Sequence, residues 1–257
     1  MPTITEPAKL RAATTYNAAS DHFDDAPLGF WQRYGERTVD RLALRHGARV
    51  LDVGCGTGAS ALPAAARVGP SGRVTGVDLA ERLLEIARQK AANRDLGNAE
   101  FHFGDTERMG YPDRHFDAVI CVFAIFDGQL AITTWGPRVL EPGAGAFWSA
   151  VKELRPDLYL GFNPWDRITE PAAVCSLLAE AGIANADIAA EHGRQDLRSP
   201  EDWWTIVVGS GFRSIVDQMA PELAGRLREA NLAAIRSHDI TSVETNVIYA
   251  VARKTST

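Results

Sequence analysis

Residues 51–58 read LDVGCGTG, a pattern that indicates the fold class. The run that leads into it, residues 48–53, is short and mostly apolar, which predicts a buried strand. The alanine-rich run that follows predicts a helix ending near Gly69. Glycines in such a turn permit positive φ and let a ligand lie against bare backbone, and free amides at the start of the helix favour an anion. The stretch therefore predicts a ligand-binding turn between a strand and a helix.

Strand and helix patterns alternate on both sides of this turn. Strands are predicted at residues 73–78, 100–103 and 116–126, and a helix is predicted at residues 81–92. Upstream, residues 28–46 predict a helix that Gly47 would end. Alternation at this spacing is typical of βαβ units. We therefore expect an α/β fold with a mostly parallel sheet, right-handed connections and helices on both faces.

The second half of the chain continues less regularly. The expected elements are a fifth strand at 129–135, a short helix at 146–154, a helix from Pro171 that Gly182 ends, a sixth strand at 183–190, a helix capped by Ser199, a helix at 221–237 and one closing strand at 242–253.

Composition excludes several classes of protein. The 257 residues include 27 Lys+Arg and 33 Asp+Glu, a net charge of −6, which argues against a nucleic-acid binder. The longest apolar run, residues 118–126, is far shorter than the roughly 20 residues of a membrane-spanning helix. The polar start has no apolar signal segment, so we expect a cytoplasmic protein. Cys55, Cys121 and Cys175 lack CxxC spacing, which argues against a disulfide scaffold and a zinc site, and we expect no metal.

Two cofactor classes fit the glycine turn. Gly54, Gly56 and Ala59 match the relaxed GxGxxG/A pattern of dinucleotide folds, with Asp78 ending the next strand. Asp52 and the third glycine extend the match to DxGxGxG, which favours a different cofactor. The sequence also lacks a Tyr-x-x-x-Lys set, so nothing supports an NAD-dependent oxidoreductase.

Four motifs in chain order carry a more specific resemblance. They are LDVGCGTG at 51–58, GVDLAERLLEIAR at 76–88, FGD at 103–105 and FDAVICVFAIF at 116–126. With them the chain resembles the class I S-adenosylmethionine-dependent methyltransferases, in the small-molecule group that includes the ubiquinone/menaquinone C-methyltransferases. The resemblance covers about residues 16–126.

The resemblance implies both fold and activity. The fold would be a single Rossmann-like domain over residues 1–257, with an antiparallel closing strand, an N-terminal cap at 1–46 and a substrate-side insertion at about 193–220. The activity would be transfer of a methyl group from S-adenosylmethionine to a carbon, oxygen or nitrogen atom of a small molecule.

The resemblance also implies the cofactor site. Asp52, with the amides of the first two glycines, would hold the methionine end, Asp78 would accept hydrogen bonds from the ribose hydroxyls, and Asp105 would accept the adenine amino group. The implied cofactor-binding residues are Asp52, Gly54, Cys55, Gly56, Thr57, Gly58, Asp78, Leu79, Gly104, Asp105, Thr106 and Cys121, with Val122 and Phe123 beside the methyl group. The plainer alternatives are that Asp78 caps the next helix and that Asp105 is a turn residue.

The acceptor site is less clearly marked. Tyr16 and His22 are candidate catalytic residues because, in the family, the N-terminal segment folds over the substrate. Trp203, Trp204 and Phe212 could form an aromatic wall for a flat or lipophilic acceptor, although core packing is the larger expectation.

One feature departs from the family. Only Asp127 and Gly128 separate the predicted fourth and fifth strands, whereas a parallel connection needs a crossover of a dozen or more residues. Either the two strands form an antiparallel hairpin, or the family's crossover helix has been lost, which we favour. The loss motivates a second hypothesis, a cofactor-binding pseudo-enzyme or regulatory protein without turnover.

Overall fold

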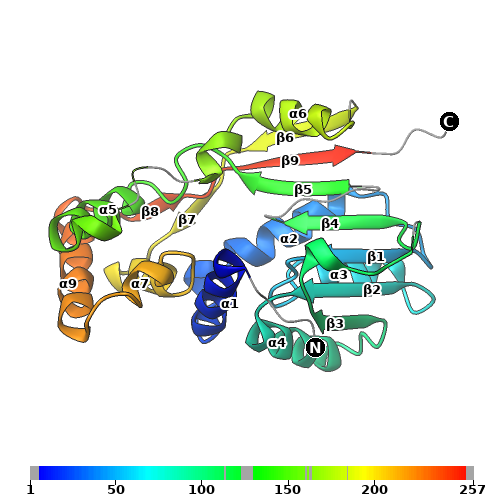
Figure 1. Ribbon diagram of the computed structural model, residues 1–257, viewed down its shortest axis with the longest axis horizontal. Helices are drawn as coiled ribbons and strands as arrows, with labels where there is room; N and C mark the ends of the chain where they lie inside the picture. The colour runs from blue at the N-terminus through cyan, green and yellow to red at the C-terminus, as the bar shows by residue number, and fades with distance from the viewer. Residues whose placement is uncertain are drawn as a thin grey trace.

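The computed structural model describes residues 6–112, 114–122, 130–159, 161, 164–183 and 185–252. Seven strands form the main sheet in the order β3-β2-β1-β4-β5-β9-β6, and β7 and β8 form a separate pair (Figure 1). The strands are β1 Arg49–Val53, β2 Arg73–Asp78, β3 Ala99–Phe103, β4 Ala118–Val122, β5 Leu130–Trp135, β6 Ala186–Glu191, β7 Arg194–Asp196, β8 Ser242–Glu244 and β9 Val247–Ala252.

Helices flank the sheet and form a smaller body at one end of it (Figure 1). The α-helices are α1 Pro7–Ala19, α2 Phe30–Arg41, α3 Ala61–Val68, α4 Glu81–Asn93, α5 Gly143–Leu154, α6 Pro171–Glu180, α7 Pro200–Val208, α8 Arg213–Val216 and α9 Pro221–Ser237. Short 3₁₀ turns are η1 Ala26–Leu28, η2 Thr106–Arg108, η3 Pro156–Leu158 and η4 Pro164–Ile168.

Side chains alternate between the two faces of the sheet, as the strand period requires. On β1, Val50 packs with the residues of α2, α3 and α4, whereas its neighbour Leu51 packs on the opposite face with Val174 and Leu178 of α6. The sheet is therefore covered by helices on both faces. The predicted α/β class with a mostly parallel sheet and an antiparallel closing strand is confirmed, since β9 runs antiparallel to both β5 and β6.

The connection between β4 and β5 resolves the alternatives left by the sequence. The two strands pair in parallel, with Val119 opposite Leu130, so the hairpin interpretation is wrong. The turn at Asp127 and Gly128 lies outside the described residues. Because only residues 123–129 separate the strands, a crossover helix of ordinary length does not fit between them.

Three sequence expectations need correction. The helix predicted at 28–46 ends at Arg41, because Leu42 turns into extended backbone and is buried against the sheet; Gly47, at φ +80°, lies in the turn before β1 instead. The polar start, for which no helix was predicted, forms α1. The expected closing strand is two strands, because Asn246 breaks it by accepting the Gly193 amide and donating to the Pro137 carbonyl.

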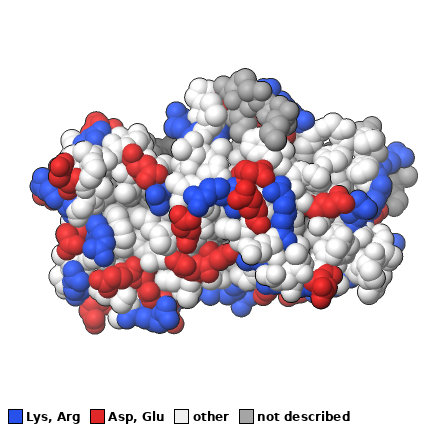
Figure 2. Space-filling model, turned by 90° about the horizontal axis from the view of Figure 1, so that it is seen from below, with Lys and Arg blue, Asp and Glu red and all other residues white. Residues whose placement is uncertain are grey.

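The molecular surface carries both signs of charge. Figure 2 shows Lys and Arg interleaved with Asp and Glu across the face seen from below, without a continuous basic surface on that face. Within the described part of the chain, every helix is too short or too polar to cross a membrane.

Candidate cofactor site

The glycine turn is bonded tightly to the end of β2. Gly54 and Gly56 have φ values of +66° and +51°, a backbone region that glycine adopts without a Cβ clash. The Gly54 amide donates to the Val77 carbonyl at 2.8 Å, and the Gly56 amide donates to Asp78 Oδ2 at 2.9 Å. These two amides already have acceptors, so the structure does not leave them free for a carboxylate as the sequence led us to expect.

Asp78 holds the turn and the next helix together. Its second oxygen accepts the Ala80 amide at 2.9 Å, at the start of α4. Burial raises the pKa of Asp78, and the hydrogen bonds from the amides partly offset that rise. Asp78 therefore does cap the start of α4, as the plainer alternative predicted. Each carboxylate oxygen retains further acceptor capacity, so capping leaves room for a ribose hydroxyl.

Asp52 is completely buried near the carboxyl end of β1. Ser60 Oγ donates to its Oδ2 at 2.7 Å, whereas no hydrogen bond reaches its Oδ1 within the described structure. Burial raises the pKa of Asp52 to about 7; the hydrogen bonds from Ser60 and from the Ala61 amide oppose the rise, and the nearby Asp78 adds to it. A buried carboxylate oxygen without a donor is costly. It is therefore suited to receive an ammonium group from a ligand.

A cavity of about 360 Å³ opens beside the turn, at the carboxyl ends of β1, β2 and β4. In parallel α/β sheets, ligands bind at this edge. Helix α1, which Figure 1 shows between the sheet and α7, forms one of its walls through Ala12, Ala13 and Tyr16. Phe23, Trp31 and Trp135 add aromatic surface, and the rings of the first two stack with centroids 5.6 Å apart.

The cavity brings together most, though not all, of the residues expected at the site. Lining it are Tyr16, Gly54, Cys55, Gly56, Thr57, Asp78, Leu79, Thr106 and Val122. Thr57 is held in place by Asp24, whose carboxylate accepts the Thr57 hydroxyl at 2.8 Å and pairs with Lys90 at 2.6 Å.

The remaining expected residues lie outside the lining. Asp52 is fully buried and meets the lining through its hydrogen bond with Ser60. Gly58 faces Leu62 of α3, and Gly104 packs near Val77. His22 is partly exposed and contacts Asp25 at 2.9 Å, away from the cavity. Cys121 is fully buried in the core, because alternation along β4 directs its neighbour Val122 into the cavity instead. Phe123 lies outside the described residues.

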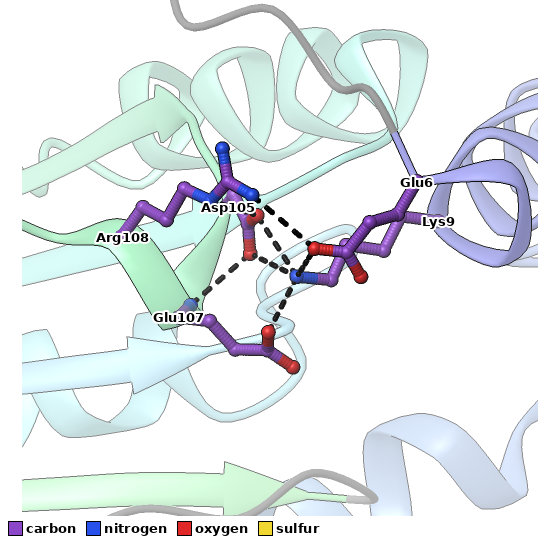
Figure 3. A network of polar contacts seen from close by, with 5 residues as sticks. All are labelled: Glu6, Lys9, Asp105, Glu107 and Arg108. Atoms are coloured by element: carbon purple, nitrogen blue, oxygen red, sulfur yellow. Dashed lines mark hydrogen bonds and ion pairs between the residues drawn. The ribbon is translucent and has the colours of Figure 1, made fainter.

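Asp105 is already engaged by a residue that the sequence analysis did not identify. Lys9 Nζ lies 2.9 and 3.1 Å from the two Asp105 oxygens (Figure 3). These pairings lower the pKa of Asp105, and Lys9 makes the largest contribution. The sequence offered no signal for this contact, because the partners are 96 residues apart.

The aromatic residues of the predicted insertion mainly form core. Trp203 is fully buried and donates its indole N–H to Asn231 Oδ1 at 3.0 Å. The Phe212 ring packs 4.7 Å from Phe147, centroid to centroid. Trp203, Trp204 and Phe212 therefore pack in or against the core, which was the larger expectation. Gly211, Ser214 and Ile215 nevertheless line a second cavity of about 510 Å³, which shares Ala12 and Tyr16 with the first.

Comparison with known proteins decides the family. A family model described as "Methyltransferase domain" matches residues 50–143. The chain is 37% identical over 146 residues to aklanonic acid methyltransferase of Streptomyces sp. strain C5, covering 56% of this chain and 66% of that protein. It is 34% identical over 135 residues to the ubiquinone/menaquinone biosynthesis C-methyltransferase UbiE of Ectopseudomonas oleovorans, covering 51% of this chain and 77% of that protein. The chain belongs to the class I S-adenosylmethionine-dependent methyltransferases.

Other relatives of this methyltransferase match over a smaller share of their length. Alignments cover 44% and 51% of two further curated methyltransferases. The solved structure of the [4+2]-cyclase SpnF superposes with a TM-score of 0.57 at 19% identity and covers 99% of this chain and all of that one. At this identity the likeness concerns the fold alone, and SpnF's name shows that the fold also hosts a different reaction.

The residues of the methyltransferase site fit S-adenosylmethionine. Asp78 lines the cavity, and Asp52 lies behind the lining, where it accepts a hydrogen bond from the lining residue Ser60 and keeps one oxygen without a donor. Gly56 lines the cavity opposite Phe23 at φ +51°, a backbone conformation that residues other than glycine rarely adopt.

Proposed function

We propose that this methyltransferase transfers the methyl group of S-adenosylmethionine to a small-molecule acceptor. The observation that carries the proposal is a pair of acids at the cavity on the carboxyl edge of the sheet: Asp78 in the lining, and Asp52 buried behind the lining residue Ser60 with an oxygen that lacks a donor. Asp52 would bind the ammonium of the methionine end, and Asp78 would bind the ribose hydroxyls. Thr106 would contact the adenine edge.

When bound, S-adenosylmethionine supplies a methyl group already activated by its sulfonium. Alignment by the protein then accounts for much of the acceleration. The aromatic surfaces of Tyr16, Trp31 and Trp135 would contact the cation and exclude water. Burial and the Asp78 carboxylate raise the pKa of Tyr16, so its hydroxyl stays protonated near neutral pH and can donate a hydrogen bond but not serve as a base. His22 lies outside the cavity and is not proposed as a base.

The second cavity is the proposed acceptor site. It adjoins the first along Ala12 and Tyr16, and Leu158 and Ile215 give it apolar surface suited to a lipophilic molecule. Relatives named for aklanonic acid, nocamycin and ubiquinone/menaquinone biosynthesis support a small-molecule acceptor. Their names include both O- and C-methyltransferases. The pseudo-enzyme hypothesis is not favoured, because these relatives are named as enzymes.

Calorimetric titration tests the cofactor assignment. We expect saturable one-to-one binding of S-adenosylmethionine and S-adenosylhomocysteine and no binding of NAD. Asp78→Ala should abolish binding, because it removes the ribose acceptor and the anchor of the Gly56 amide. Asp187→Ala, on the exposed side of the edge strand β6, is the matched control and should bind normally. Wild-type affinity in the Asp78 variant would remove Asp78 from the site.

A further inference from the structure

Helix α1 covers the cofactor cavity but has little apolar attachment of its own. Its large apolar contact is made by Tyr16, which packs edge-on against Phe23 near the carboxyl end of the helix, whereas the buried residues are the small Ala13, Thr15 and Ala19, and Leu10 is 46% exposed. Small side chains of this kind bury little apolar surface and contribute correspondingly little stability. The position of the amino end of α1, which lacks a large buried side chain, therefore depends strongly on polar contacts.

The carboxyl end of α1 is held by Arg82 at the start of α4. The Arg82 amide donates to Asn17 Oδ1 at 3.0 Å, and its guanidinium donates to the Asn17 carbonyl at 3.2 Å and pairs with Asp21 at 2.7 Å. This end therefore stays close to the wall of the cavity and can serve as the pivot of the helix.

The amino end of α1 is held by an ionic network around Lys9 (Figure 3). Lys9 Nζ contacts both oxygens of Asp105, Glu107 Oε2 at 2.6 Å and Glu6 Oε1 at 3.4 Å. Arg108 approaches Glu6 at 3.3 Å and Asp105 at 3.8 Å. Lys9 and Asp105 keep only 15% and 10% of their side-chain surface exposed, so this pair forms the most enclosed part of the network.

The network binds the helix to the carboxylate that the family resemblance places at the adenine. Asp105 immediately precedes Thr106, which lines the cavity, whereas Lys9 belongs to the helix that covers it. We propose that Lys9 is a latch: by pairing with Asp105 and Glu107 it holds α1 closed over the cavity and sets the rate at which the cofactor enters and leaves. The identity of the ligand in this inference rests on the proposed function.

The latch acts on rates because α1 is a wall of the cavity. A ligand that fills the cavity exchanges fastest when the amino end of α1 swings away from η2, which requires the Lys9 contacts to break. Loosening them accelerates entry and exit together and leaves the affinity nearly unchanged. Since ionic contacts near the surface are screened by salt, high ionic strength should act in the same direction as loss of Lys9.

The first test measures exchange of S-adenosylhomocysteine by stopped-flow fluorescence, with Trp31 and Trp135 in the cavity wall as probes. In 50 mM NaCl, association and dissociation should both be about five-fold faster for Lys9→Met than for wild type, with Kd changed less than about two-fold. In 500 mM NaCl the wild-type rates should approach those of the variant. Arg73→Met, which breaks an exposed 2.6 Å pair with Glu100 at the start of β2, is the control and should match wild type.

A second measurement needs no ligand. Amide hydrogen exchange in the first two turns of α1, which fray once they leave η2, should be about five-fold faster in Lys9→Met than in wild type, with α9 unchanged. Equal rates of exchange in both experiments would overturn the latch. Weaker affinity without faster association would also overturn it, since Lys9 would then be an ordinary binding residue. Wild-type protein that fails to bind S-adenosylhomocysteine would overturn the proposed function, and hydrogen exchange would still decide the latch.

Discussion

Among single residues, Asp52 shows most directly how a group in the cofactor site can lower the stability of the ligand-free protein. Its folded-state pKa of about 7 lies above the unfolded value of 3.8, because the carboxylate is buried. The stability that the protonated form contributes is therefore fully present below about pH 4 and is lost as the pH rises through about 7. At physiological pH the ligand-free protein carries this cost, and a bound ammonium would relieve it.

Asp52→Asn should separate these two effects. The amide keeps the shape and can still accept from Ser60, so the ligand-free variant should be more stable than wild type at pH 8, by up to about 4 kcal/mol, with the difference growing between pH 4 and 7. Its affinity for S-adenosylmethionine should fall at least about ten-fold, since a charged partner is lost. Chemical denaturation across pH, together with calorimetry, measures both. Asp40→Asn, at an exposed carboxylate, should follow the wild-type profile. A pH-independent stability difference would contradict the buried-charge explanation.

At the scale of elements, α2 supports the glycine turn by direct backbone contact. A Cβ at Gly35 would come within 2.5 Å of the Ala59 backbone, whereas a Cβ at Gly225 in α9 would meet nothing within 4 Å. Gly35→Ala should therefore cost about 1–3 kcal/mol through overpacking and weaken cofactor binding by displacing the turn. Gly225→Ala should add about 0.5–1 kcal/mol, the usual gain for a helix interior. Chemical denaturation of both variants measures the two changes in the free energy of unfolding. A stabilised Gly35 variant would show that α2 can shift to make room for the added methyl group.

The elements that could be predicted are those whose signal is local. Strands β1 to β4 are apolar runs next to glycines or acids, and Asp52 and Asp78 follow from their places in such strands. Helix α1 escaped prediction because its polar and small residues form no apolar face. Its place in the site depends on Lys9 and Asp105, which are far apart in sequence. Likewise, only the folded chain brings Asn246 to Pro137 and so breaks the closing strand.

At the scale of the whole molecule, one core joins the sheet to the body at its end. A single cluster of buried residues contains Phe30 and Tyr34 of α2, Tyr249 of β9 and Trp203 of α7, together with residues of α5 and α9. Helix α2, which precedes the first strand in sequence, thus shares one hydrophobic core with α5, α7 and α9, which follow β5. The separate pair β7 and β8 is also tied to this interior, because Tyr34 donates to the Thr245 carbonyl beside it. We therefore expect the predicted insertion and the sheet to unfold together, as one domain.

Asn231→Ala tests this cooperativity. The substitution leaves the buried indole N–H of Trp203 without its acceptor, which should cost about 1–3 kcal/mol. If the molecule is one cooperative unit, native-state hydrogen exchange should show the same loss of opening free energy in β1 and β4 as in α9. Asn93→Ala, at an exposed position of α4, should alter none of them. Loss of protection confined to α9 and α7 would instead show that the end body opens as a separate unit, and the proposed acceptor cavity beside it would then open independently of the cofactor site.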